Sequence, residues 1–235
     1  MTAELFDSLV VLHDVDSRSA AINMAIDEAL LEAAQAPSIR FYRWGSPALS
    51  FGYFGRFADV AAYAGERDLV RRWTGGGIVF HGEDLTYSIV IPATDPRFHE
   101  SAASIYEKLH RALRRALLQQ GQSATVAGAA DAGNARAGRT AASDRGYNHC
   151  FSNPVRADVM LNGRKIAGAA QRRTARGLLQ QGSIQHVDVG NGLPQRFAAA
   201  SAGRCETREI DRSIVQRAHE IAAQKYATDA WLRRR

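Results

Sequence analysis

The chain has 235 residues, of which 46% are hydrophobic, so it is long enough to bury a full core as one domain. Its apolar runs fall far short of the ~20 residues that cross a bilayer, and its first residues, MTAELFDSLVV, lack a basic region. The net charge is +6, but the basic residues are scattered, which disfavours nucleic-acid binding and fits an acidic protein partner. We therefore expect a cytoplasmic protein with no signal peptide and no membrane or nucleic-acid partner.

Two residue types are scarce in this chain, and their positions are informative. The only cysteines are Cys150 and Cys205, which are too few for a disulfide scaffold or a thiolate zinc site. Of the 30 basic residues only Lys108, Lys165 and Lys225 are lysine. Because arginine supplies most of the positive charge, a lysine in an unusual place is a candidate for amine chemistry.

Strand and helix patterns alternate in the first third of the chain. A helix is expected after the capping residues 16–19, because apolar residues recur at helical spacing from Ile22 to Ala33. Strands are expected at 4–13, 40–44 and 48–53, and a short helix at 58–66.

The stretch 71–92, RRWTGGGIVFHGEDLTYSIVIP, joins three strand patterns (69–73, 77–81 and 85–91) through two polar turns. Its three consecutive glycines remove every Cβ along one segment, so a flat or long ligand can lie directly on the backbone amides. A glycine-rich hairpin turn with no ligand explains the spacing equally well. We treat the stretch as a candidate binding segment.

The remainder of the chain mixes helix and hairpin patterns. A helix is expected at 101–120, a mobile loop at about 121–148 where apolar residues are few, and a C-terminal helix at about 210–231. The alternating run 155–161, the turn Asn162-Gly163 and the run 164–171 predict a hairpin, and 178–189 predicts a further strand. Without strict strand–helix–strand alternation, these patterns predict an α/β (α+β) domain with a mixed, largely antiparallel sheet.

Several runs of sequence, in chain order, also resemble a known family. They are NMAIDEALL (23–31), RFYRWGSPALSFGYF (40–54), the glycine stretch, and GRKIAGAAQRR with LLQQGSI (163–184). Together they resemble the lipoate-protein ligase and octanoyltransferase family. CFSNP from Cys150 and AAQKYATDAW at 222–231 are most similar to its cysteine-dependent octanoyltransferases of Gram-positive type. The resemblance implies a single catalytic domain over 1–235, with the curved sheet flanked by helices of class II synthetases and biotin ligases.

Cys150 and Lys165 are the candidate catalytic residues. Transfer of an acyl group from a thioester to an amine is easiest through a protein thioester, which requires an accessible cysteine in an electropositive setting. Cys150 has His149 beside it, and the Asn162-Gly163 hairpin brings Lys165 back towards it. The resemblance places the family's catalytic lysine at Lys165. Taken alone, a cysteine is more often a small buried hydrophobe, and for Cys205 we keep that interpretation.

The resemblance implies a set of substrate-binding residues, with Gly168 included because a glycine beside the lysine lets an acyl carbonyl come close. They are Arg71, Arg72, Gly75, Gly76, Gly77, His81 and Gly168. A solvated surface charge for each arginine and a structural histidine at position 81 remain open alternatives. The family usually has an acidic residue at Gly82, a histidine at Gln181 and, in octanoyltransferases, more often an arginine at Gly77. These departures leave the acyl donor open.

The resemblance implies an acyltransferase that takes octanoyl from acyl carrier protein through Cys150 and delivers it to a lysine of a lipoyl domain or glycine-cleavage H protein, with no cofactor or metal. The alternative is a lipoate-protein ligase, which uses ATP and magnesium and does not need Cys150. Such ligases usually carry an extra C-terminal domain, for which 235 residues leave little room. A biotin ligase and a non-catalytic lipoyl-domain or acyl-binding protein are weaker alternatives.

Overall fold

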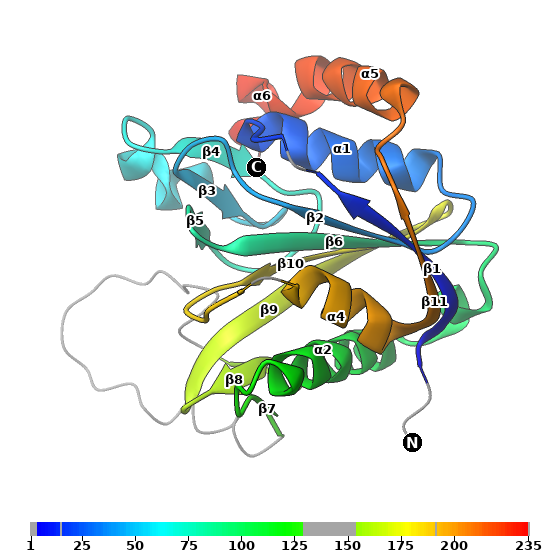
Figure 1. Cartoon of the computed structure of the whole chain (residues 1–235). Coiled ribbons are helices and arrows are strands. Elements are labelled where there is room, and N and C mark those ends of the chain that lie inside the picture. Colours follow the sequence, from blue (N-terminus) through cyan, green and yellow to red (C-terminus); the bar gives the residue numbers. More distant parts are fainter. Residues whose placement is uncertain (1–3, 15, 129–153, 191, 235) are drawn as a thin grey trace.

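The computed structural model describes residues 4–14, 16–128, 154–190 and 192–234 (Figure 1). The elements before residue 100 are β1 (Phe6–His13), α1 (Ala20–Glu32), β2 (Ser38–Tyr42), β3 (Ala48–Phe51), 3-10 turns at Phe57–Asp59 and Ala61–Tyr63, β4 (Asp68–Arg71), β5 (Val79–His81), β6 (Leu85–Pro92) and a 3-10 turn at Pro96–His99. Those that follow are α2 (Ala102–Gln119), β7 (Thr125–Val126), β8 (Val159–Leu161), β9 (Arg164–Thr174), β10 (Gly177–Ile184), α4 (Leu193–Ser201), β11 (Ala202–Arg208), α5 (Arg212–Ile221), a π-helical turn at Ala222–Tyr226 and α6 (Asp229–Leu232).

Within these residues an eight-stranded sheet runs in the order β11-β1-β2-β6-β10-β9-β8-β7. β1 is parallel to β11 and β2, whereas every other neighbouring pair in this sheet is antiparallel. A smaller sheet has the order β4-β3-β5. Helices α1 and α5 lie over one face of the large sheet, and α2 and α4 over the other (Figure 1). The expected α/β domain with a mixed, largely antiparallel sheet is confirmed.

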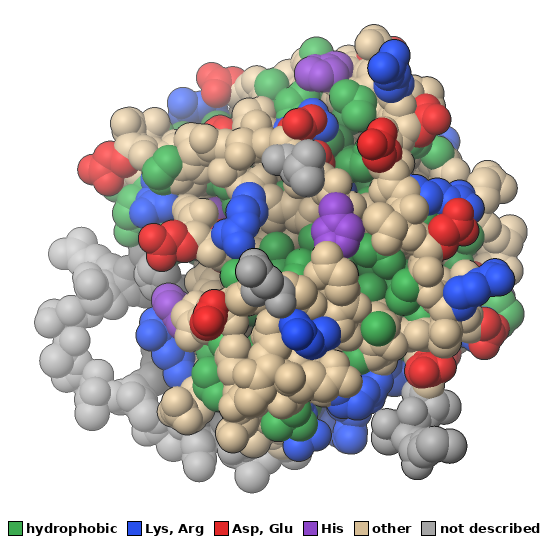
Figure 2. All heavy atoms as spheres, in the orientation of Figure 1, with side chains coloured by type: hydrophobic (Ala, Val, Ile, Leu, Met, Phe, Trp, Pro, Cys, Tyr) green, Lys and Arg blue, Asp and Glu red, His purple; other side chains and the backbone are tan. Residues whose placement is uncertain are grey.

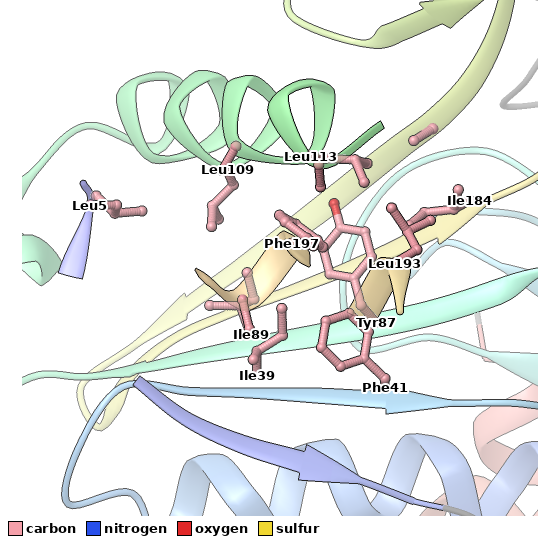
Figure 3. Packing of buried hydrophobic residues seen from close by; sticks show 14 of the residues in the cluster. Leu5, Ile39, Phe41, Tyr87, Ile89, Leu109, Leu113, Ile184, Leu193 and Phe197 are labelled. Atoms are coloured by element: carbon pink, nitrogen blue, oxygen red, sulfur yellow. The ribbon is translucent and has the colours of Figure 1, made fainter. Parts of the chain in front are cut away.

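Strand β6 shows how the sequence assigns the two faces of the sheet. Its side chains alternate, so Tyr87 and Ile89 join the apolar core with Leu109 and Phe197 from α2 and α4 (Figure 3). Each such side chain contributes roughly 1.5–3 kcal/mol through burial. Ser88, between them in sequence, points to the α1 side, where its hydroxyl bonds to a carboxylate of that helix. The apolar face therefore anchors the sheet, while the opposite face carries polar groups.

The two main helices begin at serine caps. The Oγ of Ser19 accepts from the amide of Ile22, and the Oγ of Ser101 accepts from the amide of Ser104. On α2 the expected apolar stripe from Ile105 to Leu117 is buried. None of the described helices is long and apolar enough to span a bilayer. Acidic and basic side chains are interspersed over the face of the molecule shown in Figure 2.

The second half of the chain differs from expectation in several places. β8 begins at Val159 rather than 155, because Ala157 has a positive φ of 70° and turns the chain away from extended geometry. β10 ends at Ile184 rather than 189, two residues before His186, whose φ is 57°. The expected C-terminal helix is divided among α5, the π-helical turn and α6. Residues 121–128 of the expected loop include β7, and 129–148 lie outside the described residues.

Helix α4 and strand β11 were not expected from the sequence. The AGRCETR run of β11 is polar and exposed after its first residue, so it lacks a strand pattern of its own. It is a strand because its backbone pairs with β1, with Cys205 opposite Leu9. The expectation that Cys205 is buried was therefore wrong: its side chain is exposed on an edge strand.

His110 on α2 makes stability depend on pH. The ring is fully buried, with Nδ1 2.7 Å from the carbonyl oxygen of Ala157 and Nε2 3.0 Å from the hydroxyl of Tyr87. Burial lowers the pKa of His110 to about 4, below the value of about 6.5 in an unfolded chain. The unfolded chain thus takes up the proton first, so this contribution is complete above about pH 6.5 and is lost as the pH falls towards 4.

We expect acidification to pH 5 to cost about 2 kcal/mol of unfolding free energy through this group alone. Urea unfolding at pH 7.5 and pH 5 measures the loss, and the same experiment on His110→Gln removes the titrating ring. A pH dependence of equal size in both proteins would show that His110 is not the cause.

Candidate active site

A narrow, mainly apolar pocket is lined by residues of both sheets and of α1, and its volume is about 30 Å³. Its apolar walls come from Met24, Tyr42, Trp44, Val79, Ala169 and Ala170, and its polar groups are Ser50, Arg72, His81, Thr86, Gln181 and Ser183, with Gly168 and Gly182 completing the lining. The pocket brings together residues that are more than 150 positions apart in the sequence. Three of the expected site residues, Arg72, His81 and Gly168, are among them.

Lys165 lies beside this pocket and is not a surface cation. Its side chain is 3% exposed, and Nζ is 2.8 Å from Oδ2 of the fully buried Asp158. The other oxygen of Asp158 accepts a 2.5 Å hydrogen bond from the hydroxyl of Tyr106. A Cβ at Gly168 would lie 2.7 Å from the Lys165 ammonium, so the amine rests against the backbone of a pocket residue. Glycine at position 168 therefore lets Lys165 reach the pocket wall.

This close approach makes Gly168→Ala a sharp test of how Lys165 is positioned. The new methyl group would meet Cε of Lys165 at 2.5 Å, and the flexible lysine side chain would have to move away. We expect transfer activity to fall at least about 10-fold, since small misplacements of reacting groups are costly. The melting temperature should fall less than in Lys165→Ala, which leaves Asp158 with no lysine partner at all. Gly65→Ala, at an exposed glycine with open space around it, is the control. Unchanged single-turnover rates in Gly168→Ala would contradict this role.

Arg71 is buried but does not line the pocket. Its guanidinium donates to the carbonyl oxygens of Tyr53 and Gly55 and to those of three residues near the C-terminus, Trp231, Leu232 and Arg234. It is therefore not a solvated surface charge, and its expected contact with substrate stays a prediction. Its observed role is to hold the C-terminal segment against β3 and β4.

Arg72 points to the pocket, and the glycine segment holds it there. One guanidinium nitrogen donates to Oγ of Ser50 at 2.6 Å, and another donates to the carbonyl oxygens of Gly75 and Gly77. Gly76 has a φ of 87°, which a residue with a side chain rarely adopts. The three glycines do not themselves line the pocket. Gly75 and Gly77 instead present their carbonyl groups to Arg72.

His81 lines the pocket between two hydrogen-bond partners. Nε2 is 2.7 Å from Oγ of Ser50, and Nδ1 is 2.7 Å from Oδ2 of Asp84. The ring stacks on Trp44 with centroids 3.9 Å apart. Burial lowers the pKa of His81, although Asp84 opposes that shift. Both hydrogen-bond partners of the His81 ring are therefore side chains.

A buried polar network around Asp27 was missed by sequence reasoning. Its carboxylate accepts from Arg40, Ser88 and Gln181, at 2.9, 2.7 and 2.7 Å. Gln181 also accepts from Thr74 at 2.8 Å, so its amide links α1 to the glycine stretch. The available signal was Asp27 on the apolar side of α1, since a charge at such a position requires a partner.

Cys150 and the neighbouring His149 lie outside the described residues. The hairpin that precedes Lys165 forms as expected, because Asn162 and Gly163 have positive φ angles of 50° and 75° between β8 and β9. The geometry relating Cys150 to Lys165 stays a prediction.

The sheet, the mainly apolar pocket and the buried lysine beside it define the class: an α/β domain with a buried amine next to a pocket. The chain belongs to the lipoyl protein ligase A/B catalytic domain family, whose model matches residues 19–199. Its relatives include the octanoyltransferase LipM of Oceanobacillus iheyensis, 38% identical over 175 residues, which cover 71% of this chain and 60% of the relative. LipM of Brevibacillus brevis is 32% identical over 204 residues, 83% of this chain and 72% of that protein.

The chain thus spans about 60% of the length of the first of these relatives. Solved structures with the same fold include a lipoate-protein ligase A bound with ATP, with a TM-score of 0.72, 21% identity and coverage of 97% of this chain and 98% of that one. A bipartite lipoate protein ligase of Thermoplasma acidophilum, studied with its E2 lipoyl domain, has a TM-score of 0.65 and 20% identity, and covers 97% and 96%. At these identities the structural comparison establishes the fold.

Proposed function

We propose that the chain is an octanoyltransferase of protein lipoylation. It takes an octanoyl group from acyl carrier protein through a thioester on Cys150 and delivers it to a lysine of a lipoyl domain or glycine-cleavage H protein, without a cofactor. The observation that carries the proposal is the buried amine of Lys165 against Gly168, in the wall of a mainly apolar pocket. Identities of 32–38% to LipM octanoyltransferases support it.

The chemistry follows from these groups. The Cys150 thiolate attacks the carbonyl carbon of the donor thioester, and the carrier thiolate leaves and takes up a proton. A neutral lysine amine of the acceptor then attacks the new thioester, which forms an amide and releases Cys150. The Lys165 ammonium, held by Asp158 at 2.8 Å, stabilises negative charge on the carbonyl oxygen. It gives a proton to the departing Cys150 thiolate and then takes up the proton that the attacking amine loses.

A cluster of cations and aromatic rings next to the pocket supports an acidic partner. Arg172 lies two residues beyond the pocket residue Ala170, and its guanidinium stands 5.0 Å from the ring centres of Tyr53 and Trp73. Arg234 stands 4.7 Å from the Tyr53 ring. Over the part of the chain that the structure describes, neither arginine pairs with a carboxylate. The cluster therefore carries positive charge that an acidic protein surface can complement.

We expect Arg172→Glu to raise the KM for octanoyl carrier protein about 10-fold at low salt, with kcat unchanged, because rim charges act mainly on encounter. The effect should shrink at high salt, where exposed charges are screened. Arg173→Glu makes the same charge change on an exposed neighbour that bonds to carbonyl groups of Phe98 and Glu100. An equal rise in KM for both variants would indicate a general charge effect and contradict a docking role for the cluster.

The decisive test of the function uses two mixtures with an apo lipoyl domain. The first contains octanoyl carrier protein, and the second contains octanoate, ATP and magnesium. We expect the acceptor to gain an octanoyl group in the first mixture, as measured by intact mass. Transfer in the second mixture alone would overturn the proposal and identify a lipoate-protein ligase, whereas transfer in neither would favour a non-catalytic binder.

A further inference from the structure

Two buried side chains of the pocket and a buried carboxylate behind them form a continuous chain of hydrogen bonds that the proposed transfer does not use. Ser50 Oγ lies 2.7 Å from Nε2 of His81, and Nδ1 of the same ring lies 2.7 Å from Oδ2 of Asp84. Ser50 and His81 both line the pocket. The order of hydroxyl, imidazole and carboxylate is that of a nucleophile, its base and the group that orients the base.

The small sheet explains why these residues meet. β3 and β5 are antiparallel, with Ser50 opposite Val79, so His81, two residues further on, lies on the same face as Ser50. The turn after His81 returns Asp84 to the ring, and the amide of Gly82 donates to Asp84 Oδ1 at 3.1 Å. The arrangement thus comes from strand register and a tight turn.

The surroundings of Asp84 and His81 set their charge states. Oδ2 of Asp84 also accepts from the hydroxyls of Thr86 and Ser183, at 2.9 and 2.7 Å. Burial opposes ionisation, but His81 and the hydrogen bonds from Ser183 and the Gly82 amide bring the pKa of Asp84 below its ordinary value. The ionised carboxylate therefore accepts a hydrogen bond from Nδ1–H of His81. The lone pair of Nε2 is then directed at the Ser50 hydroxyl, and the stacked Trp44 ring holds the imidazole plane.

Arg72 supplies positive charge beside the nucleophile. Its guanidinium donates to Ser50 Oγ at 2.6 Å and lines the same pocket. The charged groups packed against His81 include Asp84, Arg72 and Arg67, of which the last donates to the carbonyl oxygen of His81. Because this distance is to Oγ itself, the guanidinium favours the partial negative charge that Oγ gains as its proton leaves.

We propose that Ser50, His81 and Asp84 form a second acyl-transfer centre, which hydrolyses medium-chain acyl esters and thioesters independently of Cys150. As Oγ attacks the carbonyl carbon, its proton passes to Nε2 of His81. The bond to the leaving alcohol or thiol breaks, and the leaving group takes that proton. Water then attacks the acyl ester on Ser50 and gives a proton to Nε2, which returns it to Oγ as the carboxylic acid departs.

Hydrolysis of p-nitrophenyl octanoate by the full chain tests this centre. We expect the wild-type protein to release nitrophenol and Ser50→Ala and His81→Gln to lose at least about 100-fold in rate, as for other triads. Ser88→Ala is the matched control, since it too removes a buried serine hydroxyl. The Ser88 hydroxyl donates to Asp27 and does not line the pocket. Equal rates in Ser50→Ala and wild type would overturn the inference.

A second measurement does not depend on the folding of any variant. An octyl fluorophosphonate, which loses fluoride as it bonds to an activated serine, should label the wild-type protein at Ser50, as located by peptide mass mapping. Labelling at another residue, or no labelling, would contradict the inference.

Cys150→Ala separates the two activities, because we expect it to lose transfer and retain hydrolysis. Loss of both in that variant would place the hydrolysis at Cys150.

Discussion

Cys150→Ala should abolish both transfer from octanoyl carrier protein and the thioester formed on the protein. Without the thiolate no sulfur atom is available to accept the acyl group, and removal of a catalytic nucleophile typically costs at least about 1000-fold in rate. Intact mass spectrometry after mixing with the donor measures the intermediate. Hydroxylamine at neutral pH distinguishes a thioester, which it cleaves readily, from an oxygen ester on a serine.

Cys205→Ala is the control, and it should leave both measurements unchanged. Cys205 lies exposed on the edge strand β11. Partial burial and the nearby carboxylate of Glu4 raise the pKa of its thiol, which lowers the thiolate fraction at neutral pH. A hydroxylamine-labile octanoyl adduct on the Cys150→Ala protein would contradict the assignment of the intermediate to Cys150.

Elements with strong local signals could be predicted from the sequence. Helix α2 has a serine cap and an apolar stripe at helical spacing, and the β8–β9 hairpin has the Asn162-Gly163 turn. Strand β11 has no such signal, because it is polar and gains its conformation from pairing with β1, about 195 positions earlier in the chain. A contact of that sequence separation is invisible to any local pattern.

The site shows the same division between local and distant information. Lys165 and His81 stand in recognisable motifs, and both lie at or beside the pocket. The adjacent Arg71 and Arg72 look alike in sequence, yet strand alternation sends one to the C-terminal segment and the other to the pocket. Asp158, the buried partner of Lys165, was read only as part of an alternating strand, because its importance depends on a tertiary contact.

Lys165 offers the most discriminating substitution in the chain. We expect Lys165→Arg to reduce single-turnover transfer nearly as much as Lys165→Ala, by at least about 100-fold. Arginine keeps the positive charge but does not release a proton near neutral pH. Its planar fork also differs from a compact ammonium that lies against Gly168 and 2.8 Å from Asp158. Stopped-flow mixing of acyl-enzyme with apo lipoyl domain gives the rates.

Stability separates this chemical role from a purely structural one. Lys165→Ala leaves the buried Asp158 carboxylate without its cation, and breaking such a pair typically costs about 3–5 kcal/mol, whereas Lys165→Arg retains a cation and should unfold closer to the wild-type temperature. Adding Asp158→Asn to Lys165→Ala removes the stranded charge and should recover stability without recovering activity. The opposite result would be transfer rates that follow the melting temperatures of these three proteins, with near wild-type transfer by Lys165→Arg. It would show that Lys165 has only a structural role, as the partner of Asp158.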